Sequence, residues 1–165
     1  MQLVKDNDPI LKQLAIPWDF DKDTNPEDVE RTMIDIMSSQ RGRGLAANQV
    51  GLLKRVFVIQ LEGQSNPIAM FNPVLLSSSS DETDVEEGCL SFPGLFIFVR
   101  RPERVEVEYL DKHKNSCKIT LTGIDARCFL HELDHLNGVC FTEKVSKLKL
   151  MLAKKKQRKY NGRTK

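Results

Sequence analysis

The sequence lacks long apolar runs, a phosphate-loop motif and paired cysteines, and each absence argues against a class of protein. There is no apolar run long enough for a secretory signal or a membrane span, so we expect a cytoplasmic protein with no membrane partner. No GK[ST] follows the glycines near residue 42, which argues against a phosphate-binding loop. The four cysteines form no CxxC pair, which argues against a structural zinc knuckle, and disulfides are not expected in a reducing compartment.

Histidine is also scarce, but two of the three histidines form a HExxH motif. His131 and His135 lie four residues apart in the sequence HELDH, with Glu132 between them. On a helix, residues four apart share a face, so both imidazoles can reach one metal ion while Glu132 flanks the open coordination position. A chance motif built from core histidines is the plainer interpretation. The spacing favours a metal-dependent hydrolase.

A catalytic metal usually has three protein ligands and one position for water, so a third ligand is needed. No histidine follows His135, and His113 lies in a polar run that we expect to be exposed. Cys89, in the segment EGCLS, is the natural candidate because a thiolate suits Zn²⁺ or Fe²⁺.

The length and the charge pattern indicate one domain with a basic end. A chain of 165 residues suits a single domain, 1–165. Residues 146–165 hold nine Lys or Arg and no acidic residue, whereas residues 1–145 hold 16 basic and 23 acidic side chains. This basic segment is either solvated charge or an arm that meets RNA.

Three helices are expected. The sequence Asn25-Pro26-Glu27-Asp28 begins one that runs to about residue 40, with apolar residues at helical spacing. The HExxH helix begins at Thr122 or Gly123 and ends with Gly138. A last helix, rich in leucine around residue 150, precedes the basic end.

Strands are expected at 55–61, 69–73, 96–99, 105–109 and 117–121, the last two as an antiparallel hairpin. The serine-rich run 77–84 is interpreted as a surface loop. The predicted fold class is α+β, with antiparallel strands packed around a central HExxH helix, an N-terminal helix and a C-terminal helix.

Three blocks in this order resemble the peptide deformylases: GRGLAANQ at 42–49, EGCLS at 87–91 and HELDHL at 131–136. The resemblance implies a hydrolase that removes the formyl group from the N-formyl-methionine of new polypeptides and releases formate. It implies one divalent ion held by Cys89, His131 and His135, with Fe²⁺ expected in the cell and Zn²⁺, Ni²⁺ or Co²⁺ in a prepared sample. Glu132 would be the general base. The side-chain amide of Gln49 and the backbone N–H of Leu90 would stabilise the oxyanion.

The resemblance also implies where the peptide binds. The peptide would add as an extended strand beside Arg43, Gly44 and Leu45. The residues expected around its first side chain, together with the neighbouring Gly88, are Val85, Glu87, Ile124, Cys128 and the aliphatic part of Arg127. Two positions depart from the family pattern. Arg43 stands where a hydrophobic residue is often found, and Leu130 stands where a glutamine commonly precedes the first histidine.

Two other functions remain open at this point. A HExxH endopeptidase would take a third ligand downstream, where none is available. In an RNA-binding or ribosome-associated module, the metal would only brace the fold. The basic segment resembles in position the C-terminal helix by which relatives approach the ribosome, so the ribosome is an expected partner beside the nascent peptide. We expect a monomer, and the sequence is compatible with a bacterial, phage-encoded or organellar enzyme.

Overall fold

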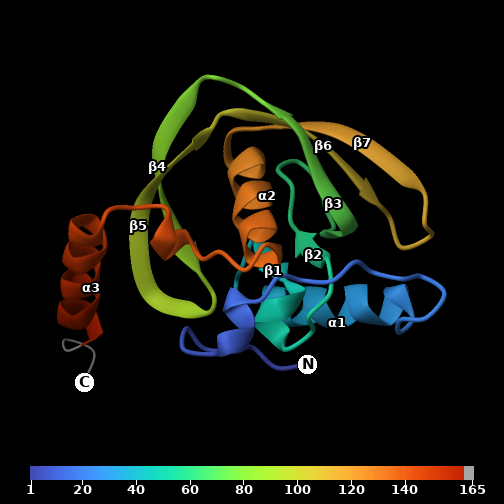
Figure 1. Ribbon diagram of the computed structural model, residues 1–165, viewed down its shortest axis with the longest axis horizontal. Coiled ribbons are helices and arrows are strands. Elements are labelled where there is room, and N and C mark those ends of the chain that lie inside the picture. The colour runs from blue at the N-terminus through green and yellow to red at the C-terminus, as the bar shows by residue number, and fades with distance from the viewer. Residues whose placement is uncertain (162–165) are drawn as a thin grey trace.

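The computed structural model describes residues 1–161, with side chains to residue 159 (Figure 1). Seven strands are present: β1 (Gly44–Ala46), β2 (Val56–Ile59), β3 (Ile68–Ser78), β4 (Glu82–Cys89), β5 (Phe92–Pro102), β6 (Arg104–Leu110) and β7 (Ser116–Thr122). The α-helices are α1 (Pro26–Ser39), α2 (Gly123–Leu136) and α3 (Lys147–Asn161). Three short 3₁₀ helices are η1 (Pro9–Lys12), η2 (Ala47–Val50) and η3 (Phe141–Glu143). Within residues 1–161 no helix combines the length and apolar character needed to cross a membrane.

The strands form two antiparallel sheets around α2. One sheet has five strands in the order β1-β2-β3-β6-β7, and the other is the β4–β5 pair. In Figure 1, α2 lies in the space between the curved β4–β5 pair and the larger sheet, α1 lies below, and α3 lies outside β5. The predicted α+β class with a central HExxH helix is therefore confirmed.

Local signals set the limits of α2 as predicted. The helix begins after Thr122, and Gly138 follows it with a φ of +71°, a conformation that glycine adopts without strain. Phe129, Leu133 and Leu136 are buried and contact the larger sheet. The apolar side of α2 thus anchors the helix, which fixes the direction of its opposite, histidine-bearing side.

The predicted N-terminal helix is also confirmed. The side chain of Asn25 accepts a hydrogen bond from the backbone N–H of Glu27 at 2.9 Å, as an N-cap should. Val29, Met33 and Met37 are buried and pack in one cluster with residues of β1 and β2. This packing supports β1, which borders the candidate site.

The predicted hairpin is confirmed as β6–β7, in which Val105 pairs with Leu121. The predicted surface loop at 77–84 is wrong. Ser77 and Ser78 pair with β6, and the segment from Glu82 onward pairs with β5, so only residues 79–81 lie between the strands. The ladder is made by backbone groups, so polar, exposed side chains such as these serines do not prevent pairing.

The strand predicted at 69–73 continues to Ser78 through an irregularity. Asn72 has a φ of +48°, and the register shifts between Phe71 and Val74. The Asn72 side chain accepts from the Trp18 N–H at 2.7 Å and donates to the Trp18 carbonyl at 3.0 Å. Asparagine tolerates this left-handed conformation, so the strand bends here and does not stop.

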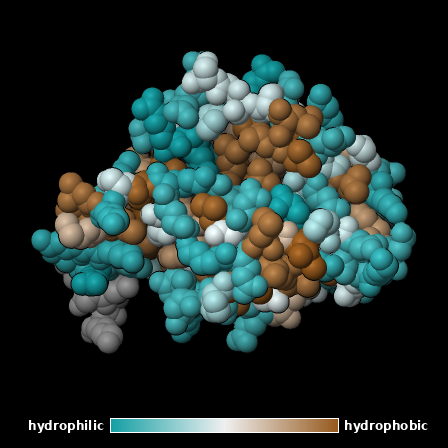
Figure 2. Space-filling model, viewed as in Figure 1, coloured by the Kyte–Doolittle hydropathy of each residue, from teal (hydrophilic) through white to brown (hydrophobic). Residues whose placement is uncertain are grey.

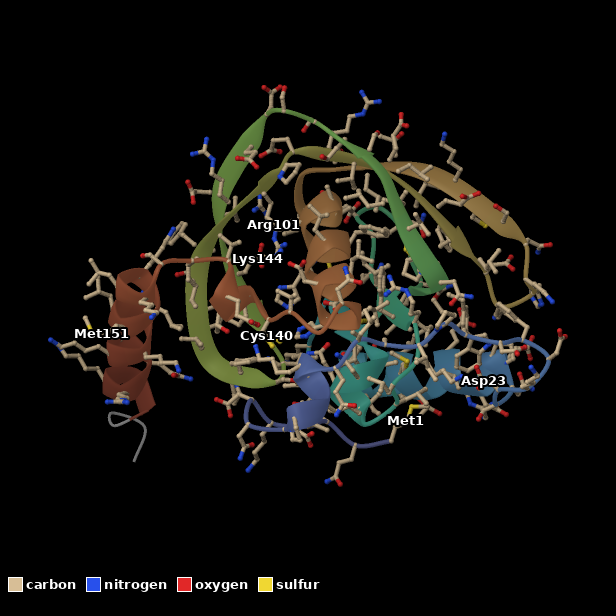
Figure 3. The ribbon with its side chains drawn as sticks, viewed as in Figure 1. Met1, Asp23, Arg101, Cys140, Lys144 and Met151 are labelled. Atoms are coloured by element: carbon tan, nitrogen blue, oxygen red, sulfur yellow. The ribbon has the colours of Figure 1, made fainter. Side chains whose placement is uncertain are left out.

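The predicted C-terminal helix is confirmed as α3. Leu150 and Ala153 pack against the cluster that contains β5 and η3 residues. Leu148, Met151 and Leu152 are exposed by 61%, 59% and 57%. Met151 points away from the rest of the molecule (Figure 3). Among the described residues, therefore, only one side of this helix is covered by the protein itself.

Candidate metal centre

Cys89, His131 and His135 meet although they come from two distant segments. Cys89 is the last residue of β4, and both histidines lie on α2. The Cys89 sulfur and one ring nitrogen of each histidine lie within 4.8 Å of one another, with Cys89 Sγ 3.2 Å from His135 Nε2. Both histidines are buried and Cys89 is half-buried. One thiolate and two imidazoles form a donor set that fits zinc or ferrous iron.

A buried carboxylate orients one of the histidines. Glu87 Oε2 lies 3.0 Å from His131 Nδ1, which leaves His131 Nε2 for a metal ion. Arg101 holds both oxygens of Glu87, through Nε at 2.8 Å and Nη2 at 3.0 Å. Burial alone would raise the pKa of Glu87, but the hydrogen bonds from His131 and Arg101 outweigh it and lower the pKa to about 2. Glu87 is therefore an ionised group that fixes the ring of His131.

The same arginine ties three segments together. Arg101 Nη1 donates to Asp134 Oδ2 at 2.6 Å, and Lys144 Nζ lies 2.9 Å from Asp134 Oδ1. Figure 3 shows Arg101 and Lys144 beside α2, from β5 and from the segment after η3. Neither Arg101 nor Asp134 was predicted from the sequence to belong to the site. The signal available for Arg101 was the strand alternation of Arg100 and Arg101, which turns one of the two inward.

Glu132 is buried next to the three ligands, and its Oε2 has no hydrogen-bond partner within the described residues. Burial raises the pKa of this carboxyl to about 7, against the opposing effect of His131. Gly44 packs directly against it, since a Cβ built on Gly44 would lie 2.8 Å from Glu132 Cγ and Cδ. A carboxyl group with a pKa near neutrality can both accept and release a proton.

His135 is held in its neutral form. Burial, together with the neighbouring His131 and Arg101, lowers its pKa well below the usual value. Neutral imidazole is the form that binds a metal ion.

Gln49 brings amide donors to the same place. Its Oε1 accepts from the Ala46 N–H at 2.8 Å, which fixes the orientation of the amide. Its Nε2 lies 3.3 Å from Cys89 Sγ and 3.2 Å from Ser91 Oγ. Leu90 lies in the turn between Cys89 and Ser91. Both residues predicted to supply the oxyanion donors are therefore next to Cys89, Gln49 through space and Leu90 along the chain.

A cavity of about 550 Å³ lies beside these ligands and is lined by Cys89, His131 and Glu132, whereas His135 is not among its lining residues. Its walls contain most of the predicted substrate-binding residues: Arg43, Gly44, Glu87, Gly88, Ile124, Arg127 and Cys128. Leu45 and Val85 are not among the residues that line it. Leu45 is fully buried in the cluster beneath β1, and Val85 is half-buried farther along β4. Of the other residues singled out from the sequence, His113 is exposed and Leu130 is buried in the core.

One edge of β1 is open beside this cavity. β1 is the end strand of its sheet and, within the part of the chain that the structure describes, pairs only with β2. The carbonyl of Arg43 accepts from the Gln60 N–H at 2.8 Å, so the backbone groups of the next residue, Gly44, point to the other side. A peptide strand can pair at this edge.

Comparison with known proteins agrees with the geometry. Residues 1–151 match the family model described as polypeptide deformylase. The peptide deformylase of Finegoldia magna is 40% identical over 147 residues, 89% of this chain and 90% of that protein. The Maricaulis maris peptide deformylase is 40% identical over 155 residues, 92% of this chain and 88% of that protein.

Solved structures give the same result. A Synechococcus elongatus peptide deformylase in complex with actinonin has a TM-score of 0.87 and 39% identity, covering 95% of this chain and 85% of that one. A Legionella pneumophila peptide deformylase has a TM-score of 0.88 and 36% identity, covering 99% of this chain and 96% of that one. The chain therefore belongs to the polypeptide deformylase family, the metal-dependent hydrolases that remove the formyl group from the N-terminal methionine of newly made polypeptides.

Proposed function

We propose that Cys89, His131 and His135 hold the metal ion of this deformylase and that Glu132 moves the protons. The observation that carries the proposal is the buried Glu132 carboxyl, with its uncommitted Oε2, beside three converging ligand atoms. The ion, when bound, supplies a Lewis acid and lowers the pKa of water. Glu132 takes a proton from the attacking water and passes it to the leaving amine.

The developing negative charge on the formyl oxygen needs donors that are already in place. The Gln49 amide, oriented by Ala46, and the backbone N–H of Leu90 are proposed for this role. Because Leu90 follows Cys89 directly, both the ligand and the donor are positioned by one turn.

The peptide itself is proposed to pair with the open edge of β1 at Gly44. The side chain of the first peptide residue would then enter the cavity and contact the part of its wall formed by Ile124, Cys128 and Arg127. Backbone hydrogen bonds do not depend on the side chains of the peptide, which suits an enzyme that must accept many nascent chains.

Loss of one ligand tests this assignment. Cys89→Ala, His131→Ala and His135→Ala should each lose stoichiometric metal and nearly all formate release from a formyl-Met peptide, because two ligands hold a divalent ion weakly. Full metal occupancy in Cys89→Ala would move the third ligand elsewhere. Internal cleavage of peptides, or metal binding without formate release, would instead favour the endopeptidase or the ribosome-associated module.

The identity of the ion is a separate proposal. We propose Fe²⁺ in the cell, with Zn²⁺, Ni²⁺ or Co²⁺ able to occupy the same donors during preparation. Metal analysis of anaerobically purified protein, with formate release measured on the same sample, tests this. Zinc as the sole metal in fully active anaerobic protein would contradict it.

We also propose that α3 approaches the ribosome. Nine basic residues follow Ser146, and Figure 2 shows apolar atoms on the upper half of α3 and hydrophilic atoms on its lower half. Truncation is a poor test, because Gln157 Nε2 donates to the Pro93 carbonyl at 2.8 Å and Pro93 lines the cavity. The double variant Lys155→Glu, Lys159→Glu changes exposed residues only.

The double variant should weaken ribosome binding and reduce its salt dependence, because fewer phosphate contacts release fewer ions. Hydrolysis of short formyl peptides should not change. Lys5→Glu, an exposed change on another segment, is the control. If the double variant and the control bind the ribosome with equal affinity, the basic residues do not contact the ribosome and are only solvent-exposed charges. A cytoplasmic monomer remains our expectation for the protein when it is not on the ribosome.

A further inference from the structure

One side of the cavity rim carries two arginines. Arg41 and Arg43 both line the cavity and are exposed, with Gly42 between them. Arg41 forms no ion pair within the described residues, whereas Arg43 Nη2 donates to Asp125 Oδ1 at 3.1 Å. The catalytic assignments above use the side chain of neither arginine.

Asp125 fixes the guanidinium of Arg43 in one place. Asp125 lies in the first turn of α2, next to Ile124, and accepts from the Glu62 N–H at 3.1 and 3.2 Å. The Arg43 side chain is 42% exposed and that of Asp125 is 16% exposed. An arginine has five N–H donors, so the anchored group keeps donors for a second carboxylate.

The direction of a bound peptide follows from β1. This strand runs from Gly44 toward Gln49 and the metal ligands. A peptide that starts at the metal centre and pairs antiparallel with β1 must run outward, past Gly44 and then past Arg43. Side chains alternate along a strand, so the third side chain lies on the same face as the first, about 6.6 Å farther out.

In the proposed placement the first side chain of the peptide points toward Ile124, and the Arg43 guanidinium is paired with Asp125, the residue next to Ile124. We propose that Arg43 makes this enzyme favour nascent peptides with Asp or Glu as their third residue. The inference rests on the peptide placement given under the proposed function. Glu86 is an exposed carboxylate that also lines the cavity, and its Oε1 lies 3.9 Å from Lys156 Nζ, so its repulsion of an acidic peptide is reduced.

The test compares formyl-Met-Ala-X peptides in which X is Glu, Gln or Lys. At low ionic strength the parent should show a kcat/KM about threefold higher for the Glu peptide than for the Gln peptide, which is the size expected of a half-exposed ion pair. The kcat/KM for the Lys peptide should be lower than that for the Gln peptide. Arg43→Gln should bring the Glu-to-Gln ratio to about one, and Arg43→Lys should keep most of it. Added salt should reduce the preference in the parent.

Arg41→Gln is the matched control, because it removes the same charge from the same rim. Its Glu-to-Gln ratio should stay near that of the parent. Equal rates for Glu and Gln in the parent, or an unchanged ratio in folded Arg43→Gln, would overturn the inference, as would loss of the ratio in Arg41→Gln alone. Failure of the proposed function would look different, since formyl-Met-Ala-Ser would then release no formate at all.

Discussion

Gly44→Ala is the most specific perturbation that the site offers, because one added methyl group meets the proposed base. The new Cβ would lie 2.8 Å from Glu132 Cγ and Cδ, closer than real Cβ contacts. Glu132 is only 3% exposed and its other sides are packed, so the added methyl group would push its carboxyl group toward the cavity that it lines. Overpacking of this kind costs about 1 to 3 kcal/mol of stability, partly offset by about 0.4 to 1 kcal/mol from the less flexible unfolded chain.

The effect on catalysis should be larger than the effect on folding. A displacement of about 1 Å in a catalytic group costs about 10²-fold in rate, so we expect kcat to fall by about that factor. The metal content should not change, since no ligand is touched. Formate release, metal analysis and thermal denaturation on one preparation separate these three quantities.

Gly42→Ala is the control for that experiment. Its added Cβ would meet Leu90 Cδ1 at 2.8 Å, the end of a half-buried side chain that can rotate, so the loss in kcat should stay below about fivefold. A Gly44→Ala enzyme with kcat within about threefold of the parent and full metal would refute the reasoning. It would mean that Glu132 tolerates displacement or is not the base.

Three further substitutions probe separate parts of the site. Glu132→Gln should keep stoichiometric metal and lose about 10⁴-fold in kcat, and rates within about tenfold of the parent would contradict the assigned base. Gln49→Leu should keep metal and fold while kcat falls by about 10² to 10³ with little change in KM, so a KM effect alone would make Gln49 a recognition residue. Glu87→Gln should weaken metal affinity by about 10- to 100-fold in a chelator competition, because His131 loses its carboxylate partner, and unchanged affinity would argue against that role.

Features with local causes could be predicted from the sequence. The limits of α1 and α2 follow from Asn25 and Gly138, which act on the residues next to them. The HExxH ligands are equally local, because helix geometry alone places His131 and His135 on one face. Cys89 could be predicted as a ligand only from its motif, because no local signal places the end of β4 beside α2.

Features that depend on distant pairing could not be predicted. Arg101 holds Glu87, 14 residues away, and Asp134, 33 residues away, through the β4–β5 register and the packing of α2. The polar strands at 77–84 likewise exist because partners elsewhere supply their hydrogen bonds. Val85 was expected around the first side chain of the peptide from its matching position, but it is not among the residues that line the cavity. Leu45 was expected only beside the peptide strand, which stays a prediction.

The two ends of β4 should differ in how well they tolerate inserted or deleted residues, because the turn between β4 and β5 carries groups of the proposed site. Cys89, Leu90 and Ser91 are consecutive, and they carry the proposed ligand, the proposed backbone donor and the hydroxyl beside Gln49. One inserted or deleted residue here would displace all three together. Residues 79–81, at the other end of β4, carry no group of the proposed site; Ser79 is half-buried and the next two residues are exposed, and exposed polar connections commonly tolerate insertions. A peptide tag or reporter segment therefore belongs at the 79–81 connection, while the two-residue turn must keep its length.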